Sequence, residues 1–393
     1  MKTVYVFWTE RLNEQRGGVH RIILLLLKHL PPRGFKVRYL YTLDDYQTFH
    51  LYHENPEEEV SLDVASLKSH LVANQCDIIL GQDGVFSSSL TNLVKSMAIP
   101  GVKFVNEYHN SLLLLPQKLT RDYLRFEYRH STSFKVKLSL LLKYVFYPLW
   151  KKSVWYSISK SFRYNLLNSD VTLLLTRREE PIVKSILPKG TEVKCMAIPN
   201  PLSWETIADA SILQHKKQEV LVVSRIYNPE KRIDLVLKIW KELQNRGINS
   251  DWTLRIVGDG IHRQLLMDEA SKLNLINVVW EGWSDPKPFY RTASIFMMTS
   301  ACEGWGLTLT ESMQTGVVPL AIDTYPALFD IINDGYDGYI IHGNDVKVYA
   351  DRMQGLMQNV DLRERMARNA LESCKRFSTE KIMDQWAEML ASV

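Results

Sequence analysis

The chain has 393 residues, more than one ordinary hydrophobic core organises, so two domains are expected. Its composition, 46% hydrophobic and 23% charged, is typical of a folded globular protein, and no fixed-period repeat stands out. The net charge of +4 is unevenly spread, because residues 1–200 hold 27 basic and 18 acidic side chains (net +9) and residues 201–393 hold 21 and 26 (net −5).

The first half alternates strands with helices. The stretch 3–8 ("TVYVFW") predicts a buried strand, and 17–30 predicts a helix with a glycine-rich start that "PPRG" closes. Further strands are predicted at 36–43, 76–82 and 102–109.

The second half restarts the same alternation. Strands are predicted at 219–226, 252–260, 277–283, 294–300 and 317–323, and helices at 231–247, 262–274, 286–293 and 308–316. This alternation indicates parallel βαβ units, so we predict an α/β protein with two doubly wound domains. The join falls near Pro199 and Pro201, which interrupt any regular element.

The cysteines and apolar stretches bear on the compartment. Cys76, Cys195, Cys302 and Cys374 are scattered without a close pair, which argues against a zinc site or a disulfide framework and favours a reducing environment. The start "MKTVYVFWTE" lacks the apolar core of a signal peptide, and no apolar stretch reaches the about 20 uninterrupted residues that span a bilayer. We therefore expect a cytoplasmic location.

Ligands of open parallel sheets bind at the carboxyl ends of the strands, so the loops there are the candidate sites. In "SRIYNPEKR", Arg225 and Lys231 lie on the loop that follows a predicted strand, and Arg232 lies at the start of the next helix. Fixed cations beside a helix N-terminus form an anion site that suits phosphate. A solvated basic turn is about equally compatible with this pattern. Gly258, in "VGDG", most simply belongs to a tight turn between a strand and a helix. Such a turn would also let a ligand approach the backbone.

The stretch 302–316, "CEGWGLTLTESMQTG", holds two carboxylates around a glycine loop. Gly304 and Gly306 permit close approach of a ligand, and the following helix presents free N–H groups. Glu311 lies about one turn into that helix, where it can accept hydrogen bonds from a sugar diol. A carboxylate complementing the helix dipole would explain Glu311 but not Glu303, which precedes the loop. A phosphate between them, with a sugar at each end, explains both and points to a nucleotide diphosphate sugar.

The stretch "CEGWGLTLTESMQTGVVPLA" resembles the E-x7-E segment of retaining glycosyltransferases of family 4, which have the GT-B fold. The stretches "VSRIYNPEKRIDLVLKIW", "LRIVGDG", "VVWEGWSD" and "ASIFMMTSACEGWG" resemble that family's second domain in order and spacing. The resemblance is close over about 195–345 and looser in the first half, where it depends on "QRGGVHRI" and "EYHN". One departure is the spacing of Arg225 and Lys231, which are six positions apart where five is more usual.

The resemblance implies a GT-B fold, with two Rossmann-like domains facing a central cleft. Residues 1–198 would form the acceptor-side domain and 199–377 the nucleotide-sugar domain, and a final helix at about 378–393 would cross back to the first. No metal is expected, because basic side chains and loop amides would stabilise the departing diphosphate, and no Asp-x-Asp of the kind that holds a metal is present.

The resemblance also implies roles for individual residues. Arg225 and Lys231 would neutralise the departing diphosphate, helped by the amides around Gly306, Leu307 and Thr308.

The remaining donor contacts follow from the same resemblance. Glu311 would bind the ribose, Glu303 would contact the donor sugar near the reacting carbon, and Trp283 would face the nucleobase. A buried core tryptophan is an equally good interpretation of Trp283.

In the first half, His109 matches a family histidine near the donor sugar, although a lone histidine after a strand is more often structural. Gly17 and Gly18 would let the first domain approach the diphosphate or the acceptor, and a simple turn at the helix start is the rival interpretation.

Residues 118–178 carry 13 basic and only 3 acidic side chains, interleaved with apolar and aromatic ones. This composition suits a surface that lies on anionic lipid, with a lipid-linked sugar as acceptor and a peripheral membrane location. A helix with a solvated basic face is about equally compatible, and no nucleic-acid-binding motif accompanies the charge.

We predict a retaining hexosyltransferase that moves a sugar from a nucleotide diphosphate sugar to a glycan or lipid-linked acceptor, as in bacterial surface-polysaccharide assembly. UDP is the expected base, and GDP and ADP stay open. The alternatives are an epimerase of the same fold and a non-catalytic nucleotide-sugar-binding subunit. A phosphorylase would need a pyridoxal lysine, for which the sequence gives no indication.

Overall fold

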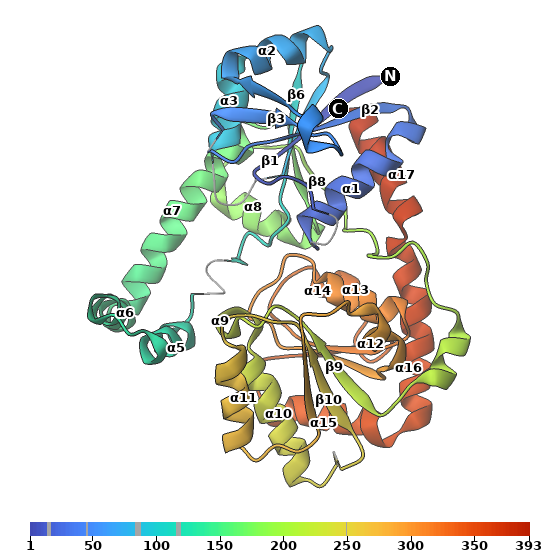
Figure 1. Cartoon of the computed structure of the whole chain (residues 1–393). Helices are drawn as coiled ribbons and strands as arrows, with labels where there is room; N and C mark the ends of the chain where they lie inside the picture. The colour runs from blue at the N-terminus through green and yellow to red at the C-terminus, as the bar shows by residue number, and fades with distance from the viewer. Residues whose placement is uncertain (14–16, 45, 83–87, 115–118, 249) are drawn as a thin grey trace. The chain divides into compact units, whose positions relative to one another are not determined.

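The computed structural model describes residues 1–13, 17–44, 46–82, 88–114, 119–248 and 250–393. The chain forms two compact units (Figure 1). Unit 1 comprises Met1–Leu112, Pro148–Pro201 and Phe377–Val393, and unit 2 comprises Leu113–Tyr147 and Leu202–Arg376. Residues 113–147, which the prediction assigned to the first domain, thus cluster with unit 2.

Unit 1 is built on an eight-stranded sheet of order β4-β3-β2-β1-β5-β6-β7-β8. Its strands are β1 (Lys2–Trp8), β2 (Phe35–Tyr41), β3 (Thr48–Leu51), β4 (Val60–Asp63), β5 (Ile78–Gly81), β6 (Lys103–Glu107), β7 (Val171–Leu174) and β8 (Cys195–Ala197). All neighbours pair in parallel except at the β2-β3-β4 edge, which is antiparallel. The sequence reasoning missed β3 and β4, because the charged run "ENPEEE" between them masks the strand pattern.

Alternation along β1 decides which side chains face which helices of unit 1. Val4 and Val6 pack with α1 (Val19–His29) and α17 (Thr379–Ser392), whereas Tyr5 and Phe7 pack with α2 (Val64–Ala73) and α3 (Ser89–Met97). The C-terminal helix α17 (Figure 1) therefore belongs to the core of unit 1, and its Trp386 is fully buried. The other helices of this unit are α7 (Tyr147–Leu167) and α8 (Glu180–Ile186).

Unit 2 has a six-stranded, wholly parallel sheet of order β11-β10-β9-β12-β13-β14. Its strands are β9 (Glu219–Val223), β10 (Thr253–Val257), β11 (Val278–Gly282), β12 (Ile295–Met298), β13 (Val318–Ile322) and β14 (Tyr339–Ile341). Its helices are α5 (Arg121–His130), α6 (Phe134–Val145), α9 (Asn228–Lys231), α10 (Ile233–Asn245), α11 (Arg263–Lys272), α12 (Lys287–Thr292), α13 (Leu307–Gln314), α14 (Leu328–Ile331), α15 (Val346–Gln358) and α16 (Val360–Ser373). The two doubly wound sheets confirm the predicted α/β class.

The predicted helix at 231–247 is wrong at its start. A single turn, α9, ends at Lys231, and Arg232 adopts a left-handed conformation (φ 53°) before α10 begins. The side chain of Asn228 then accepts a hydrogen bond from the Asp234 amide at 2.8 Å and holds the start of α10. This extra turn accommodates the six-residue spacing between Arg225 and Lys231.

Candidate functional site

Lys231 and Glu303 form the centre of the site in unit 2. The Lys231 ammonium donates a hydrogen bond to Glu303 Oε1 at 2.6 Å and lies 3.7 Å from Glu230 Oε1. Only 15% and 17% of the Lys231 and Glu303 side chains are exposed. Burial by itself lowers the pKa of Lys231, but the charges of Glu303 and Glu230 outweigh it, so the pKa is raised and the ammonium stays charged.

Arg225 joins this group through Glu230. Its guanidinium donates to Glu230 Oε1 at 2.9 Å, and its side chain is 65% exposed. The α9 turn thus brings both predicted phosphate-binding cations onto one carboxylate. Glu230 was not predicted as a site residue, since a glutamate within a basic loop has no sequence signal of its own.

The glycine loop packs closely against Tyr325. Gly306 is left-handed (φ 85°), and a Cβ at this position would lie 2.5 Å from the Tyr325 hydroxyl, so only glycine fits. Gly304 lies two residues earlier in the same loop. Leu307 and Thr308 follow as the first two residues of α13, where backbone N–H groups have no acceptor within the helix.

Glu311 is a buried carboxylate held by a neighbouring segment. It is 5% exposed, and Ser203 Oγ donates to its Oε1 at 2.6 Å. Glu311 is the fifth residue of α13 and lies beyond the first turn, so complementing the helix dipole does not explain it. Ser203 was missed because it lies about a hundred positions away in the chain.

Gly258 and Trp283 follow the ends of β10 and β11. A Cβ on Gly258 would lie 1.9 Å from the Ser224 carbonyl oxygen, so this glycine is required by the close approach of two strand ends. Trp283 is 75% exposed, which rules out the interpretation as a buried core residue.

His109, Gly17 and Gly18 lie in unit 1. Gly18 is the N-cap of α1 (φ 63°) and its carbonyl accepts from the Arg21 and Ile22 amides, which supports the helix-start interpretation, and Gly17 is exposed beside it.

His109 lies just beyond β6 in a buried polar group. Its Nε2 bonds to Gln82 Oε1, while Gln82 Nε2 donates to Glu107 at 2.8 Å. Burial lowers the pKa of His109 to about 3 and raises the pKa of Glu107 to about 8. The imidazole is therefore neutral with its proton on Nε2, which leaves Nδ1 as the acceptor nitrogen.

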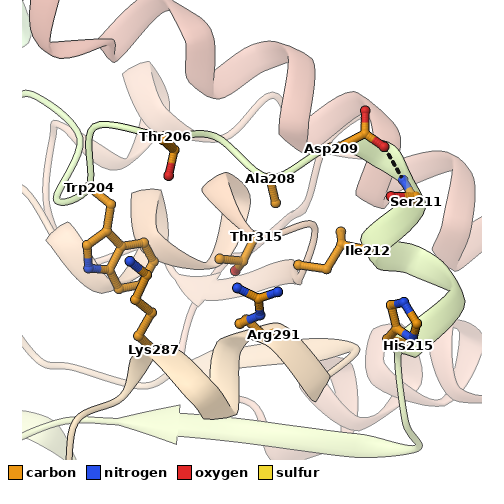
Figure 2. A pocket seen from close by; sticks show the side chains of 10 residues that line it. All are labelled: Trp204, Thr206, Ala208, Asp209, Ser211, Ile212, His215, Lys287, Arg291 and Thr315. Carbon is orange, nitrogen blue, oxygen red and sulfur yellow. Dashed lines mark hydrogen bonds between the residues drawn. The ribbon is translucent and has the colours of Figure 1, made fainter.

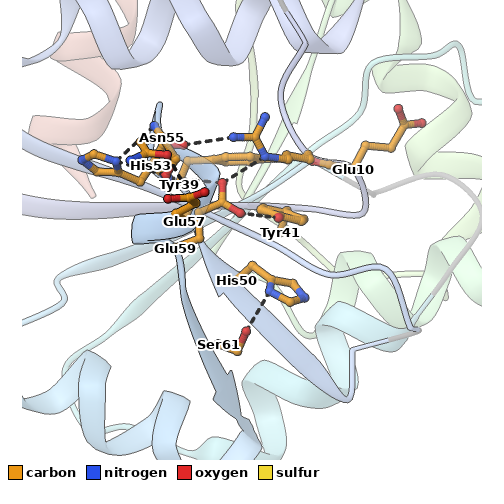
Figure 3. A network of polar contacts seen from close by, with 10 residues as sticks. Glu10, Tyr39, Tyr41, His50, His53, Asn55, Glu57, Glu59 and Ser61 are labelled. Atoms are coloured by element: carbon orange, nitrogen blue, oxygen red, sulfur yellow. Dashed lines mark hydrogen bonds and ion pairs between the residues drawn. The ribbon is translucent and has the colours of Figure 1, made fainter.

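A second polar network of unit 1 was not predicted. Glu59 accepts hydrogen bonds from Tyr41 Oη at 2.6 Å and from Arg11 Nε at 3.1 Å, and His50 stacks on Tyr41 (Figure 3). Burial and the Glu59 hydrogen bond raise the pKa of Tyr41 to about 12. The network ties the antiparallel edge of the sheet to the carboxyl ends of β1 and β2.

A separate hollow of about 260 Å³ lies between α12 and the segment 204–215 of unit 2 (Figure 2). Trp204 and Lys287 face each other at one end, at 5.5 Å between the ammonium and the ring centroid, and His215 lies at the other end. None of the predicted site residues lines this hollow.

Two further observations concern metals and membranes. Among the described residues, no group of three or more His, Cys, Asp or Glu side chains is arranged to hold a metal ion. Within the same part of the chain, none of the helices combines the length and the apolar character needed to cross a bilayer.

The architecture defines a class of fold. The structure of the Anabaena protein HepE in complex with UDP matches all of this chain with a TM-score of 0.66 at 15% identity, and covers all of that chain. The pneumococcal O-GlcNAc transferase GtfA in complex with UDP and GlcNAc matches 88% of this chain and 64% of its own, with a TM-score of 0.61 at 16% identity. The predicted GT-B fold is confirmed.

The sequence comparisons identify similarity to known glycosyltransferases, and the family match lies within unit 2. Residues 205–373 match the family described as glycosyl transferases group 1. The amylovoran biosynthesis glycosyltransferase AmsD of Erwinia amylovora is 28% identical over 182 residues, 46% of this chain and 50% of that protein. An α-1,4-N-acetyl-D-galactosaminyltransferase of Campylobacter jejuni, which acts on an undecaprenol-linked glycan, is 26% identical over 204 residues, 51% and 55% of the two chains. The alignments thus span about half the length of these curated relatives, and they support the prediction of a glycosyltransferase.

Proposed function

We propose that this protein is a retaining glycosyltransferase of family 4 whose unit 2 binds a nucleotide diphosphate sugar. The observation that carries the proposal is the meeting of Arg225, Lys231 and Glu303 beside the Gly304–Gly306 loop, with Glu311 held by Ser203 on the helix that follows. Cations, free amides and two separate carboxylates are the groups that a diphosphate between two sugars requires.

In the proposed reaction, the bond between the anomeric carbon and the diphosphate oxygen breaks and a bond to an acceptor hydroxyl oxygen forms. The acceptor proton passes to the leaving phosphate. Negative charge grows on the diphosphate as it departs, and Arg225, Lys231 and the first amides of α13 stabilise it. These groups supply the charge that a metal would otherwise provide, so we expect transfer without one.

Glu303 and Glu311 have different roles in this proposal. Glu311, buried and fixed by Ser203, accepts hydrogen bonds from the ribose hydroxyls. Glu303 contacts the donor sugar near the reacting carbon, and the exposed indole of Trp283 offers a surface for the base.

UDP is the proposed base, and a glycan or lipid-linked sugar the proposed acceptor. Two solved structures of the same fold are complexes with UDP, and the Campylobacter relative acts on an undecaprenol-linked glycan. We also propose a cytoplasmic, peripheral location, with the basic stretch 118–178 on an anionic membrane. Lys118, at the start of that stretch, lies outside the described residues.

The first experiment is calorimetry with UDP and GDP on the wild-type protein and on Glu311→Ala. We expect UDP to bind in the micromolar range and the variant to lose binding at least about tenfold, since a buried charged hydrogen bond contributes about 1.5–3 kcal/mol. Glu364→Ala, an exposed ion-pair residue of α16, is the matched control. If neither nucleotide binds, the proposed site fails.

Turnover then separates an enzyme from a binding subunit and from an epimerase. A transferase releases UDP from its UDP-sugar in proportion to acceptor added. A binding subunit releases none, and an epimerase converts the sugar without any acceptor.

A further inference from the structure

Helix α6 (Phe134–Val145) exposes an apolar face where a surface helix normally exposes a polar one. Five side chains, spaced four, three, one and three positions apart, share one side of a helix with about 3.6 residues per turn. We call them the α6 stripe: Phe134, Leu138, Leu141, Leu142 and Val145, each between 46% and 78% exposed. On the opposite side, Leu140 is the only side chain of α6 that is fully buried.

The charged side chains of α6 itself, Lys135, Lys137 and Lys143, are all basic, whereas the packed helix α5 carries both signs, including Asp122 and Glu127. Lys135 lies at one edge of the stripe by its helical position and Lys137 at the other. Residues 128–169 contain eight lysines and arginines and no aspartate or glutamate. An apolar stripe with lysines at its edges, on a stretch without acidic side chains, is complementary to a membrane surface of anionic lipids, which has both negative headgroups and acyl chains.

A hollow of about 270 Å³ continues the apolar surface between α5 and α6. Its lining includes the buried Leu124 and Leu140, the aromatic rings of Tyr128 and Tyr144, and Leu141, which also belongs to the stripe. Its lining is almost entirely apolar. The guanidinium of Arg125 lies at the hollow and donates to Tyr144 Oη at 2.6 Å, and Arg129 also lines it.

Helices α5 and α6 form a hairpin, and α5 contacts other parts of unit 2. Phe126 packs edge-on against His262 at 4.9 Å between ring centroids, and Tyr227 Oη donates to Glu127 at 3.4 Å. Both partners lie beside the loop that carries Arg225 and Lys231. The side chains of the α6 stripe are exposed beside these contacts.

We propose that the α5–α6 hairpin docks on an anionic bilayer, with the α6 stripe in the acyl-chain boundary, the lysines among the phosphates and one acyl chain in the hollow. Twelve residues of helix extend only about 18 Å, too short to cross about 30 Å of hydrocarbon, so α6 lies in the plane of the interface. A second copy of the chain is the less favoured occupant, because pairing two such faces would bring like charges together.

This inference deepens the proposed function by placing the donor site beside a membrane, but it does not depend on sugar transfer. Its test is flotation of the wild-type chain with vesicles of phosphatidylglycerol and phosphatidylcholine, and with phosphatidylcholine alone, without any nucleotide. We expect binding to the anionic vesicles that weakens as salt is raised, since the screening length falls from about 10 Å at 0.1 M to about 3 Å at 1 M. Loss of transfer activity would leave this result unchanged.

Two variants with matched controls locate the surface. Leu138→Gln with Leu142→Gln removes apolar area from the stripe, and we expect partitioning at least about tenfold weaker. Lys135→Glu reverses a charge at its edge, and a smaller loss is expected. Val348→Gln and Lys347→Glu make the same kinds of change on exposed positions of α15 and should bind as wild type.

Three outcomes would overturn the proposal. In the first, the wild-type chain does not float with anionic vesicles. In the second, the double leucine variant floats as well as the wild type. In the third, the wild type is a dimer in solution that does not bind vesicles, and the double leucine variant is a monomer. Because the leucines are already exposed, equal thermal midpoints of variant and wild type are expected and would exclude misfolding. Photolabelling from a diazirine placed in the acyl chain should mark Tyr128 or Tyr144, and labelling confined to other segments would refute the hollow as the acyl-chain site.

Discussion

Replacing Glu303 by glutamine separates nucleotide binding from sugar transfer. At an effective dielectric constant of about 20, the 2.6 Å contact between Glu303 and Lys231 corresponds to a gross attraction of about 6 kcal/mol. The 3.7 Å contact between Lys231 and Glu230 corresponds to about 4 kcal/mol. Desolvation offsets most of this, and Lys231 keeps Glu230 in the variant. We therefore expect Glu303→Gln to cost only about 1–2 kcal/mol of unfolding free energy.

The functional effect should be much larger. UDP should bind the variant as tightly as the wild type or more tightly, because the diphosphate no longer competes with Glu303 for the Lys231 ammonium. Transfer should fall about 100- to 1,000-fold if Glu303 acts beside the reacting carbon. Calorimetry and initial rates on the same preparations measure the two effects, with Glu242→Gln as control, since Glu242 pairs with Arg246 away from the site. A variant that transfers at the wild-type rate would refute the role given to Glu303.

Three further changes test the structure and the site. Gly258→Ala should lower the unfolding free energy, measured in urea, by about 3 kcal/mol or more, because its Cβ would lie 1.9 Å from the Ser224 carbonyl oxygen. Gly247 is also left-handed but lies in open space, so Gly247→Ala should cost about 1 kcal/mol. Equal losses in the two variants would contradict this. The folded pKa of Glu107, about 8, exceeds its ordinary value of 4.5, so its contribution to stability is complete below pH 4.5 and is lost as pH rises through 8. The unfolding free energy of the wild type, measured in urea, should fall by about 2–4 kcal/mol between pH 4.5 and 8, and that of Glu107→Gln by much less. The same pH dependence in both proteins would refute the raised pKa of Glu107. Trp283→Ala should weaken UDP binding about tenfold without moving the thermal midpoint, since the indole is 75% exposed, and unchanged affinity would remove it from the base site.

The residues of the proposed donor site could be grouped from the sequence because they lie in short loops at the carboxyl ends of strands. Parallel βαβ alternation predicts where those ends meet, so Arg225, Lys231 and Glu303 could be grouped before any coordinates. Their contacts in unit 2 agree with that grouping, and their roles stay predictions.

The partners of these residues were not readable. Glu230 has no motif, and Ser203 reaches Glu311 from 108 positions away, so only the folded chain brings them together. The composition of 118–178 suggested a membrane surface, but the exposed side chains of α6 could not be identified, because apolar residues at helical spacing ordinarily indicate a buried face and exposure cannot be read from spacing alone. The roles of His109, Gly17 and Gly18 in unit 1 also stay predictions.

If the proposed donor site is correct, its charges explain how binding would be kept modest while transfer is favoured. Arg225 and Lys231 are balanced by Glu230 and Glu303 before any ligand arrives. A bound diphosphate must compete with these carboxylates, so part of its attraction to the cations is offset in the ground state. As the sugar departs, the diphosphate gains negative charge and competes more strongly, while the carboxylates are unchanged. Stabilisation that grows in this way between ground state and transition state raises the rate of transfer rather than the affinity for the donor, which is the requirement for catalysis.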